Sequence, residues 1–97
     1  MTVYAIVQVK ITDREIYDRY TARFMGVFEQ FNGQLLVNDE SPRVLEGDWQ
    51  SDKVVVISFP TKDDFTAWAT SPQYLEIMQD RLAGGTATIL LTQGFDH

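Results

Sequence analysis

Residues 45–60 read LEGDWQSDKVVVISFP, and the run VVVI at positions 54–57 of this stretch decides the fold. Successive side chains of a β-strand point to opposite faces, so positions 54 and 56 share one face of the sheet while 55 and 57 share the other. Both pairs are apolar, which indicates a strand whose sheet is covered on both sides. Pro60 closes this strand, and the LEGDW segment before it, with two carboxylates around a Gly, is typical of a turn.

The composition limits the classes of partner. At 97 residues, 44% of them hydrophobic, the chain is expected to form one globular domain. Its formal net charge is −6, from 14 acidic and 8 basic residues, and the basic residues are scattered. Nucleic acids and anionic membrane surfaces are bound by clustered Lys and Arg, so neither is expected as a partner.

Metal and cofactor sites find little support in the sequence. The chain has no Cys, and its single His is the last residue, His97, so thiolate, imidazole and haem ligation are not expected. A carboxylate-oxygen site for Mg²⁺ or Ca²⁺ would remain, but no EF-hand spacing is present. We therefore expect no metal and no cofactor.

No segment has the length of a membrane span. The apolar stretch from Val3 to Val9 contains Gln8 and lacks a basic flank before it, which favours a strand over a signal peptide. A bilayer-spanning helix needs about 20 apolar residues, and no run approaches that length. A cytoplasmic protein is the expectation.

The first two elements follow from hydrophobic periodicity. Residues 2–11 alternate apolar side chains onto one face and predict a strand. Thr12 and Glu15 have the spacing of a capping box and predict the start of a helix. Asn32-Gly33 is expected to end this helix, since either residue can adopt the left-handed conformation common at helix C-termini. Apolar residues recur along it every three or four positions, at Tyr17, Tyr20, Phe24, Val27, Phe28 and Phe31.

Three further strands are predicted at residues 34–38, 53–59 and 86–92. A break at 39–43 separates the first two of these, and 44–46 either resumes pairing or stays in the loop.

Between the last two strands the helical path is broken in two. Thr61 and Ser71 are predicted N-caps, the latter followed by Pro72 at the first turn, and Gly84-Gly85 ends the second segment. The resulting β-α-β-β-α-β order predicts an α+β fold of the ferredoxin-like type with an antiparallel sheet.

The strand pattern also predicts a homodimer. Helices cover one face of such a sheet, yet two of the strands are apolar on both faces. Val54 and Val56 lie opposite Val55 and Ile57, and Tyr4 and Ile6 lie opposite Val3, Ala5 and Val7. An exposed sheet of that composition would form a large apolar patch, and the simplest cover is the same face of a second copy.

Several local patterns recur along nearly the whole chain. They are Tyr17 and Tyr20, GQLLV at 33–37, VLEGDW at 44–49, FPT at 59–61, AW at 67–68, SPQY at 71–74, Arg81 and LTQG at 91–94. Together they resemble the DUF1330 family of small bacterial proteins of unknown function. The resemblance implies a ferredoxin-like fold of the dimeric α/β-barrel type, in which two sheets pack face to face. The wider superfamily includes cofactor-free monooxygenases, isomerases and haem-dependent enzymes, and the resemblance carries over no activity of this branch.

The chain departs from the family pattern at two positions. It has Asn32-Gly33 where the family often has two glycines, and Asn38 where the family often has an Arg. If that Arg binds an anionic ligand in the family, the contact is lost or altered here.

The turn offers a pair of carboxylates and a Trp as candidate site residues. Glu46 and Asp48 can divide the roles of proton donor and acceptor when their surroundings separate their pKa values. The ordinary interpretation, which we favour, is that Asp48 caps the turn and Glu46 is a surface residue. Trp49 is the better candidate for a pocket wall, whereas Trp68 lies on a helix face with Phe65 and is expected in the core.

The helical segments offer the other candidates. Ser71 is expected to act as an N-cap, because no His or Lys lies near it in sequence to activate it. Tyr74 either presents its hydroxyl to a ligand or packs in the core. Arg81 and Arg43 can each hold a carboxylate ligand through two parallel hydrogen bonds, or pair with one of the acidic residues.

The leading hypothesis is a homodimer with a small pocket between sheet and helices that binds, or transforms without a cofactor, a small organic molecule. In it Glu46 or Asp48 is a proton acceptor or polar anchor, Arg81 orients an anionic group, and Trp49 and Tyr74 line the wall. The alternative is a non-catalytic dimer that serves as a structural or regulatory interaction module. The residues do not identify a catalytic group.

Overall fold

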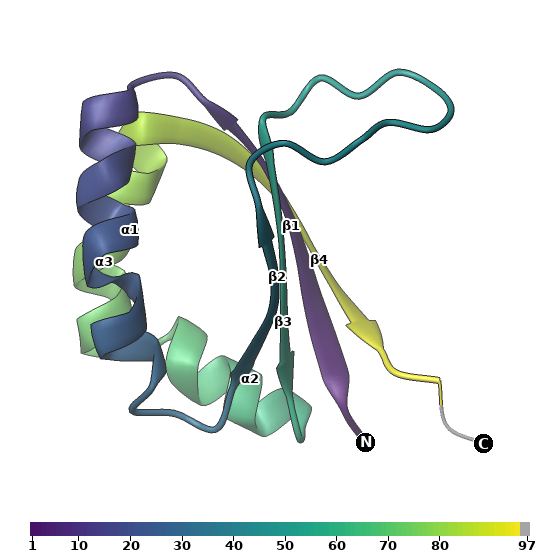
Figure 1. Ribbon diagram of the computed structural model, residues 1–97. Coiled ribbons are helices and arrows are strands. Elements are labelled where there is room, and N and C mark those ends of the chain that lie inside the picture. The colour runs from purple at the N-terminus through teal and green to yellow at the C-terminus, as the bar shows by residue number, and fades with distance from the viewer. Residues whose placement is uncertain (96–97) are drawn as a thin grey trace.

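The computed structural model describes residues 1–95 and contains one four-stranded sheet with three helices on one of its faces (Figure 1). All pairings are antiparallel and the strand order is β2-β3-β1-β4. The predicted ferredoxin-like α+β class is therefore confirmed. The elements are β1 (Val3–Ile11), α1 (Arg14–Phe28), β2 (Gln34–Asp39), β3 (Lys53–Phe59), α2 (Lys62–Ala69), α3 (Pro72–Gly84) and β4 (Gly85–Gln93).

The register of the sheet assigns side chains to its two faces. Ala5 pairs with Ile57, and both are buried beneath the helices. The neighbouring residue Ile6 pairs with Val56 on one side and Leu90 on the other, and these side chains point away from the helices. The two-sided apolar pattern of β1 and β3 thus occurs as the sequence predicts.

The N-terminus of α1 differs from the prediction by one residue. The N-cap is Asp13, whose carboxylate accepts a hydrogen bond from the Ile16 backbone N–H at 3.2 Å, and not Thr12. The Thr12 and Asp13 N–H groups both donate to the Gly84 carbonyl oxygen, at 2.9 and 3.0 Å, which joins this turn to the end of α3. Thr and Asp are both favoured N-cap residues, so the sequence pattern does not separate these two adjacent positions.

The end of α1 also corrects the prediction. The helix stops at Phe28 and its C-cap, Glu29, keeps a right-handed helical conformation. Within residues 1–95 only Gly47 has a positive φ, of 87°, so Asn32-Gly33 does not form a left-handed cap. Two further turns, closed by hydrogen bonds from the Gln30 and Phe31 N–H groups, carry the chain to β2 instead.

The other two helix starts were predicted correctly. Thr61 accepts a hydrogen bond from the Asp64 N–H at 3.1 Å, and Ser71 accepts one from the Tyr74 N–H at 3.1 Å. Pro72 occupies the first turn of α3, where no backbone donor is required.

Between β2 and β3 the chain forms a long loop of residues 40–52, which projects beyond the sheet (Figure 1). The Ser41 N–H donates to the Asp39 carboxylate at 2.8 Å, and this turn takes the chain away from β3. Residues 44–46 do not resume pairing, which resolves the alternative left open by the sequence. At its base the loop is tied to β1, since the Asp52 carboxylate accepts from the Ile11 N–H at 2.8 Å.

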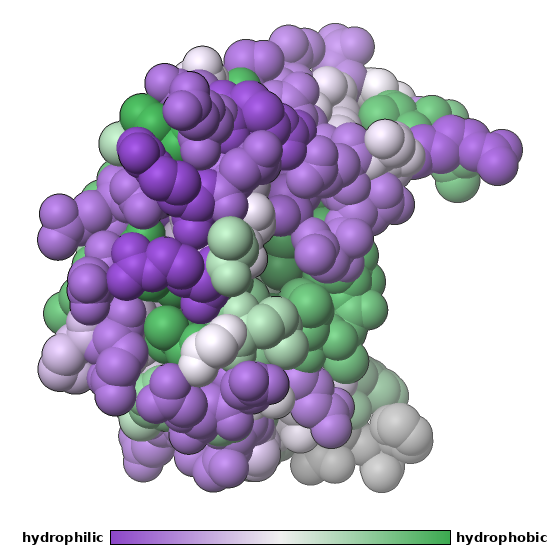
Figure 2. Space-filling model, turned by 60° about the vertical axis from the view of Figure 1, so that its left-hand side comes forward, coloured by the Kyte–Doolittle hydropathy of each residue, from purple (hydrophilic) through white to green (hydrophobic). Residues whose placement is uncertain are grey.

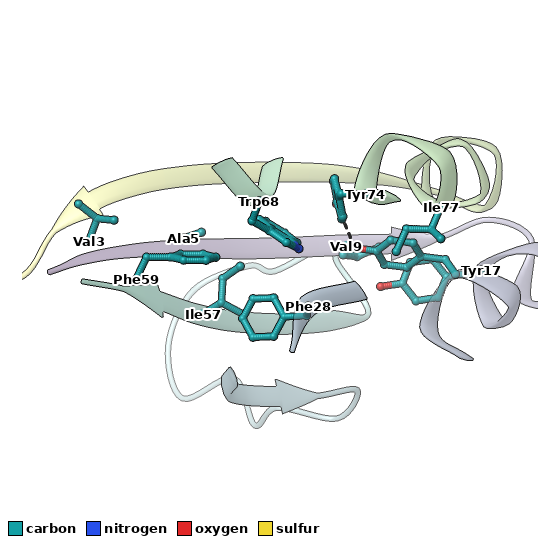
Figure 3. Packing of buried hydrophobic residues seen from close by; sticks show 11 residues of the cluster. Val3, Ala5, Val9, Tyr17, Phe28, Ile57, Phe59, Trp68, Tyr74 and Ile77 are labelled. Carbon is teal, nitrogen blue, oxygen red and sulfur yellow. Dashed lines mark hydrogen bonds between the residues drawn. The ribbon is translucent and has the colours of Figure 1, made fainter. Parts of the chain in front are cut away.

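The core lies between the helices and the covered face of the sheet and is largely aromatic (Figure 3). Phe28, Phe59 and Trp68 meet there with ring centroids 5.5–5.7 Å apart. The predicted core role of Trp68 is confirmed, since its side chain is 5% exposed.

The uncovered face of the sheet carries an apolar row across all four strands. Val37, Val56, Ile6 and Leu90 are consecutive partners in this row, and Leu90 is 57% exposed. In the space-filling view apolar residues gather on the concave side of the molecule, below the projecting loop (Figure 2).

Candidate functional site

A cavity of about 220 Å³ lies between the covered face of the sheet and helices α1 and α3. Its floor includes a row across the sheet in which Asn38, Val55, Val7 and Ile89 are consecutive partners. One face of α3 supplies residues four and three positions apart to its wall, namely Tyr74, Met78 and Arg81. The opposite wall comes from α1, through Tyr17, Tyr20, Thr21, Phe24 and Met25.

Aromatic side chains enclose the cavity. The Tyr20 and Tyr74 hydroxyl groups are 3.1 Å apart and share a hydrogen bond. Tyr74 also packs on Trp68 with ring centroids 4.2 Å apart, and Phe24 lies edge-on to both Tyr20 and Trp68. These contacts fix the rings, so the wall is preformed.

Lys53, the first residue of β3, points into this cavity with its side chain only 5% exposed. Its Nζ lies 5.0 Å from the centroid of the Tyr17 ring, a cation–π contact. Burial lowers the pKa of Lys53, and the nearby Glu40 carboxylate opposes that shift. Glu40 forms its ion pair with Arg14, at 2.8 Å. No carboxylate of residues 1–95 forms an ion pair with Lys53.

Two donor nitrogens at the cavity lack a hydrogen-bond partner among the residues that the structure describes. They are Nε1 of Trp68 and Nε of Arg81, and both atoms are buried. Figure 3 shows the Trp68 nitrogen and the Tyr17 hydroxyl pointing into the space between sheet and helices. Buried donors are normally satisfied, so these two atoms mark a place where an acceptor belongs.

The hydroxyls of Tyr17 and Tyr20 at the cavity stay protonated at neutral pH. Burial raises the pKa of Tyr17 to about 12, and the Arg81 charge opposes this rise. Burial also raises the pKa of Tyr20, with a further contribution from Tyr74. Both hydroxyls can therefore donate hydrogen bonds to a ligand.

The structure divides the residues that the sequence suggested for a site into two groups. Tyr74 and Arg81 line the cavity. Glu46, Asp48 and Trp49 lie in the loop of residues 40–52 and line a shallow groove together with Val54, whose side chain is on the uncovered face of the sheet. The two groups therefore do not meet within one chain.

Among the remaining candidates, Ser71 serves as an N-cap, and its hydroxyl also donates to the Trp68 carbonyl oxygen at 2.8 Å. Arg43 lines the loop groove and not the cavity. Asn38, the position at which the family resemblance implies an Arg, lies at the cavity floor.

Sequence reasoning missed Lys53. The signal was present, because positions 53, 55, 57 and 59 share one face of β3 and Lys53 is the only charged residue among them. A Lys at the end of an inward-facing apolar row is a candidate for a site, since buried charges are rare without a partner.

Residues 1–95 contain no group of three or more His, Cys, Asp or Glu side chains that could hold a metal ion. None of the described helices is long and apolar enough to cross a bilayer. The haem and imidazole ligand considered at His97 lies outside the described residues.

Solved structures of the same fold cover nearly the whole chain. A protein of unknown function from Rhodopseudomonas palustris is 18% identical with a TM-score of 0.83, over 99% of this chain and 84% of that one. SnoaB from Streptomyces nogalater, a cofactor-independent oxygenase, is 15% identical with a TM-score of 0.73, over 99% and 95%. A dimeric ferredoxin-like protein of unknown function from Jannaschia sp. CCS1 is 10% identical with a TM-score of 0.75, over 97% and 100%. At these identities the likeness shows the fold alone.

Sequence comparison gives the family. No functionally curated protein matches the chain. The model of the family described as "Domain of unknown function (DUF1330)" matches residues 2–95, which is nearly the full length. The resemblance seen in the LEGDW and SPQY segments is thereby confirmed, and the chain belongs to the DUF1330 family.

Proposed function

We propose that this protein binds a small organic molecule in the cavity between its sheet and helices. The observation that carries the proposal is the buried Nε1 of Trp68, a donor without an acceptor at the wall of a cavity of about 220 Å³. Apolar cavities with a few convergent polar groups are the usual form of small-molecule sites. In this proposal Tyr74 forms part of the wall and Arg81 orients the ligand.

The cavity also has groups suited to reaction without a cofactor. The protonated hydroxyls of Tyr17 and Tyr20 can donate to a carbonyl or enolate oxygen, and the Lys53 charge can stabilise negative charge that develops on it. SnoaB, of the same fold, is a cofactor-independent oxygenase, which makes cofactor-free chemistry a hypothesis worth testing for this fold.

A fragment screen with a filled-cavity variant tests the binding proposal. We would add single-ring compounds, among them phenol, benzoate, benzamide and cyclohexanol, and follow the fluorescence of Trp68 in a Trp49→Phe background. Ala69 lines the cavity, so Ala69→Leu should abolish the binding of any hit by occupying its space. The matched control is Ala22→Leu, on the exposed side of α1, which should bind as the parent does.

Two outcomes of the screen would contradict the proposal. One is that no fragment binds to the parent protein, and the other is that hits bind equally well to the Ala69→Leu variant. Circular dichroism of each variant confirms that the comparison is made between folded proteins.

We further propose that the protein is a homodimer in which the uncovered sheet faces of two copies pack together. The row of Val37, Val56, Ile6 and Leu90 supplies an apolar surface, and a protein of the same fold from Jannaschia is dimeric. The loop of residues 40–52 lies on the same side, and Leu45 is 85% exposed there. Glu46, Asp48 and Trp49 would then lie near the partner copy and contribute to that interface.

A further inference from the structure

The charges that line the cavity are opposite to those of the protein as a whole. The chain carries 14 acidic and 8 basic residues, yet the cavity is lined by Lys53 and Arg81 and by no Asp or Glu. A surface sampled at random from this composition would contain more carboxylates than cations. The charged side chains that line the cavity are therefore all positive, and such a lining favours an anionic ligand.

Neither of these two cations forms an ion pair within residues 1–95, and they differ from the other unpaired cations in lining the cavity. Arg14 pairs with Glu40 at 2.8 Å, and Arg23 pairs with Glu76 at 3.2 Å, both at the surface. Within residues 1–95 neither Lys53 nor Arg81 takes part in an ion pair, and Nε of Arg81 is buried without an acceptor. A buried cation without a counter-charge is unfavourable, and a bound anion would offset that cost.

Lys53 lies beside the ring of Tyr17. Its Nζ is 5.0 Å from the ring centroid. Burial raises the pKa of the Tyr17 hydroxyl, and the charge of Arg81 acts against that rise. Both cations thus act on Tyr17, which lines the same cavity as they do.

The walls and the volume define the rest of the ligand. Tyr20, Phe24, Trp68 and Tyr74 present ring edges and faces, which favour a flat aromatic group over a saturated one. A cavity of about 150 Å³ holds benzene in another protein, so about 220 Å³ has room for one ring with small substituents. Polycyclic compounds would exceed it.

We propose that the ligand of this cavity is a single-ring aromatic carboxylate, with its carboxylate held by Lys53 and Arg81 and its ring packed against Trp68 and Tyr74. This inference rests on the proposed function, since it names the class of molecule that the same cavity binds. An oxygen substituent on the ring can accept the hydrogen bond that Nε1 of Trp68 offers.

Isothermal titration with three matched probes tests this inference. The probes are 4-hydroxybenzoate, its neutral isostere 4-hydroxybenzamide, and the saturated acid trans-4-hydroxycyclohexanecarboxylate. We expect 4-hydroxybenzoate to bind about ten-fold or more tightly than the amide, because a hydrogen bond to a charged group contributes at least about that factor. We expect it to bind about three-fold or more tightly than the saturated acid, because the contribution of aromatic packing is smaller.

Variants assign the effect to the two cations. Lys53→Met and Arg81→Met should each weaken 4-hydroxybenzoate binding about ten-fold or more while changing the affinity for the amide by less than about three-fold. Lys62→Met, at an exposed position at the start of α2, removes one positive charge elsewhere and should leave both affinities unchanged. If Lys53→Met is poorly folded, Lys53→Gln makes the same comparison with a polar side chain.

The outcomes separate this inference from the proposed function. Equal binding of acid and amide, or of the aromatic and saturated acids, would overturn the ligand class and leave small-molecule binding intact. If no probe binds while fragments from the screen still bind in a manner blocked by Ala69→Leu, the ligand class is wrong and the cavity is still a site. If neither probes nor fragments bind, both proposals are wrong.

Discussion

Lys53 combines burial, positive charge and the lack of an ion-pair partner within residues 1–95. Its aliphatic stem packs on the covered face of β3, while its ammonium contacts only the face of Tyr17 among the described rings. Such a residue lowers the stability of the fold unless a ligand supplies the missing charge. At the scale of single residues, it is therefore the position where stability and binding are expected to conflict.

We predict that Lys53→Met stabilises the protein at neutral pH. Burial lowers the pKa of Lys53 below its usual value of 10.5, so between these two pKa values the unfolded chain binds more protons than the folded one. The stability of the wild type therefore rises with pH across that window, whereas Met contributes no such dependence. The advantage of the variant should be largest on the acidic side of the window and shrink as the pH approaches 10.5.

The measurement is the free energy of unfolding by urea from pH 6 to pH 10, for the wild type, Lys53→Met and the exposed control Lys62→Met. A variant that is less stable than the wild type at pH 7, or a difference that does not change with pH, would contradict the account. Greater stability with weaker carboxylate binding is the combination that a ligand-binding lysine should show.

The residues of the site could be predicted only in part. Tyr74 and Arg81 were identified from side-chain chemistry, and both line the cavity. Glu46 and Asp48 are candidates because a carboxylate pair can divide acid and base roles, but they line a groove with Val54 on the uncovered face of the sheet. The pairing register of the strands decides which residues share a face of the sheet, and a short sequence motif carries no information about that register.

At the scale of elements, the fold was predictable wherever local rules were sufficient. The strand at 53–59 and the caps at Thr61 and Ser71 occur where the pattern placed them. The N-cap of α1 is Asp13 and not Thr12, a difference of one residue between two side chains that can both cap a helix. Helix boundaries commonly differ by one or two residues, and local rules do not fix them more closely.

We predict that Gly84→Ala destabilises the protein by about 1–3 kcal/mol. A Cβ at position 84 would lie 2.6 Å from the backbone nitrogen of Tyr17, so α1 and α3 would have to move apart. The same substitution at Gly26, an exposed position of α1 with no atom within 4 Å of a Cβ, should stabilise by about 0.5–1 kcal/mol.

Thermal and urea unfolding of the two variants check this prediction. Opposite signs are expected, because helix propensity favours Ala at both positions and only Gly84 has a neighbour in the way. A Gly84→Ala variant as stable as Gly26→Ala would mean that the α1–α3 contact is looser than the structure indicates.

At the scale of the whole molecule, the two faces of the sheet differ in what they contact. The covered face and the helices form the core and the cavity, and the uncovered face carries the apolar row through Ile6 and Val56. The dimer was predicted from the alternation in two strands, and the structure places the apolar row on the uncovered face. A dimer would cover that row and leave the cavity within each copy.

We predict that the unfolding midpoint rises with protein concentration. For a dimer, each ten-fold increase in concentration adds about 1.4 kcal/mol to the apparent stability per dimer. Val56→Lys places a charge at the centre of the apolar row and should yield a monomer whose midpoint no longer depends on concentration. Gln34→Lys, at the outer end of the same face on β2, is the matched control and should remain dimeric.

Sedimentation equilibrium gives the masses directly. A wild-type protein that is folded and monomeric at micromolar concentration would refute the argument from the apolar row. So would a Val56→Lys variant that remains a dimer as stable as the wild type.

The most direct test of the central claim is a crystal structure of the protein with 4-hydroxybenzoate at a concentration that saturates it in titration. We predict electron density for one ring inside the cavity, with the carboxylate within hydrogen-bond distance of Lys53 and Arg81 and the hydroxyl near Nε1 of Trp68. Density for the ligand at another place, such as the groove beside Trp49, or a cavity that stays empty while the titration shows saturation, would contradict it.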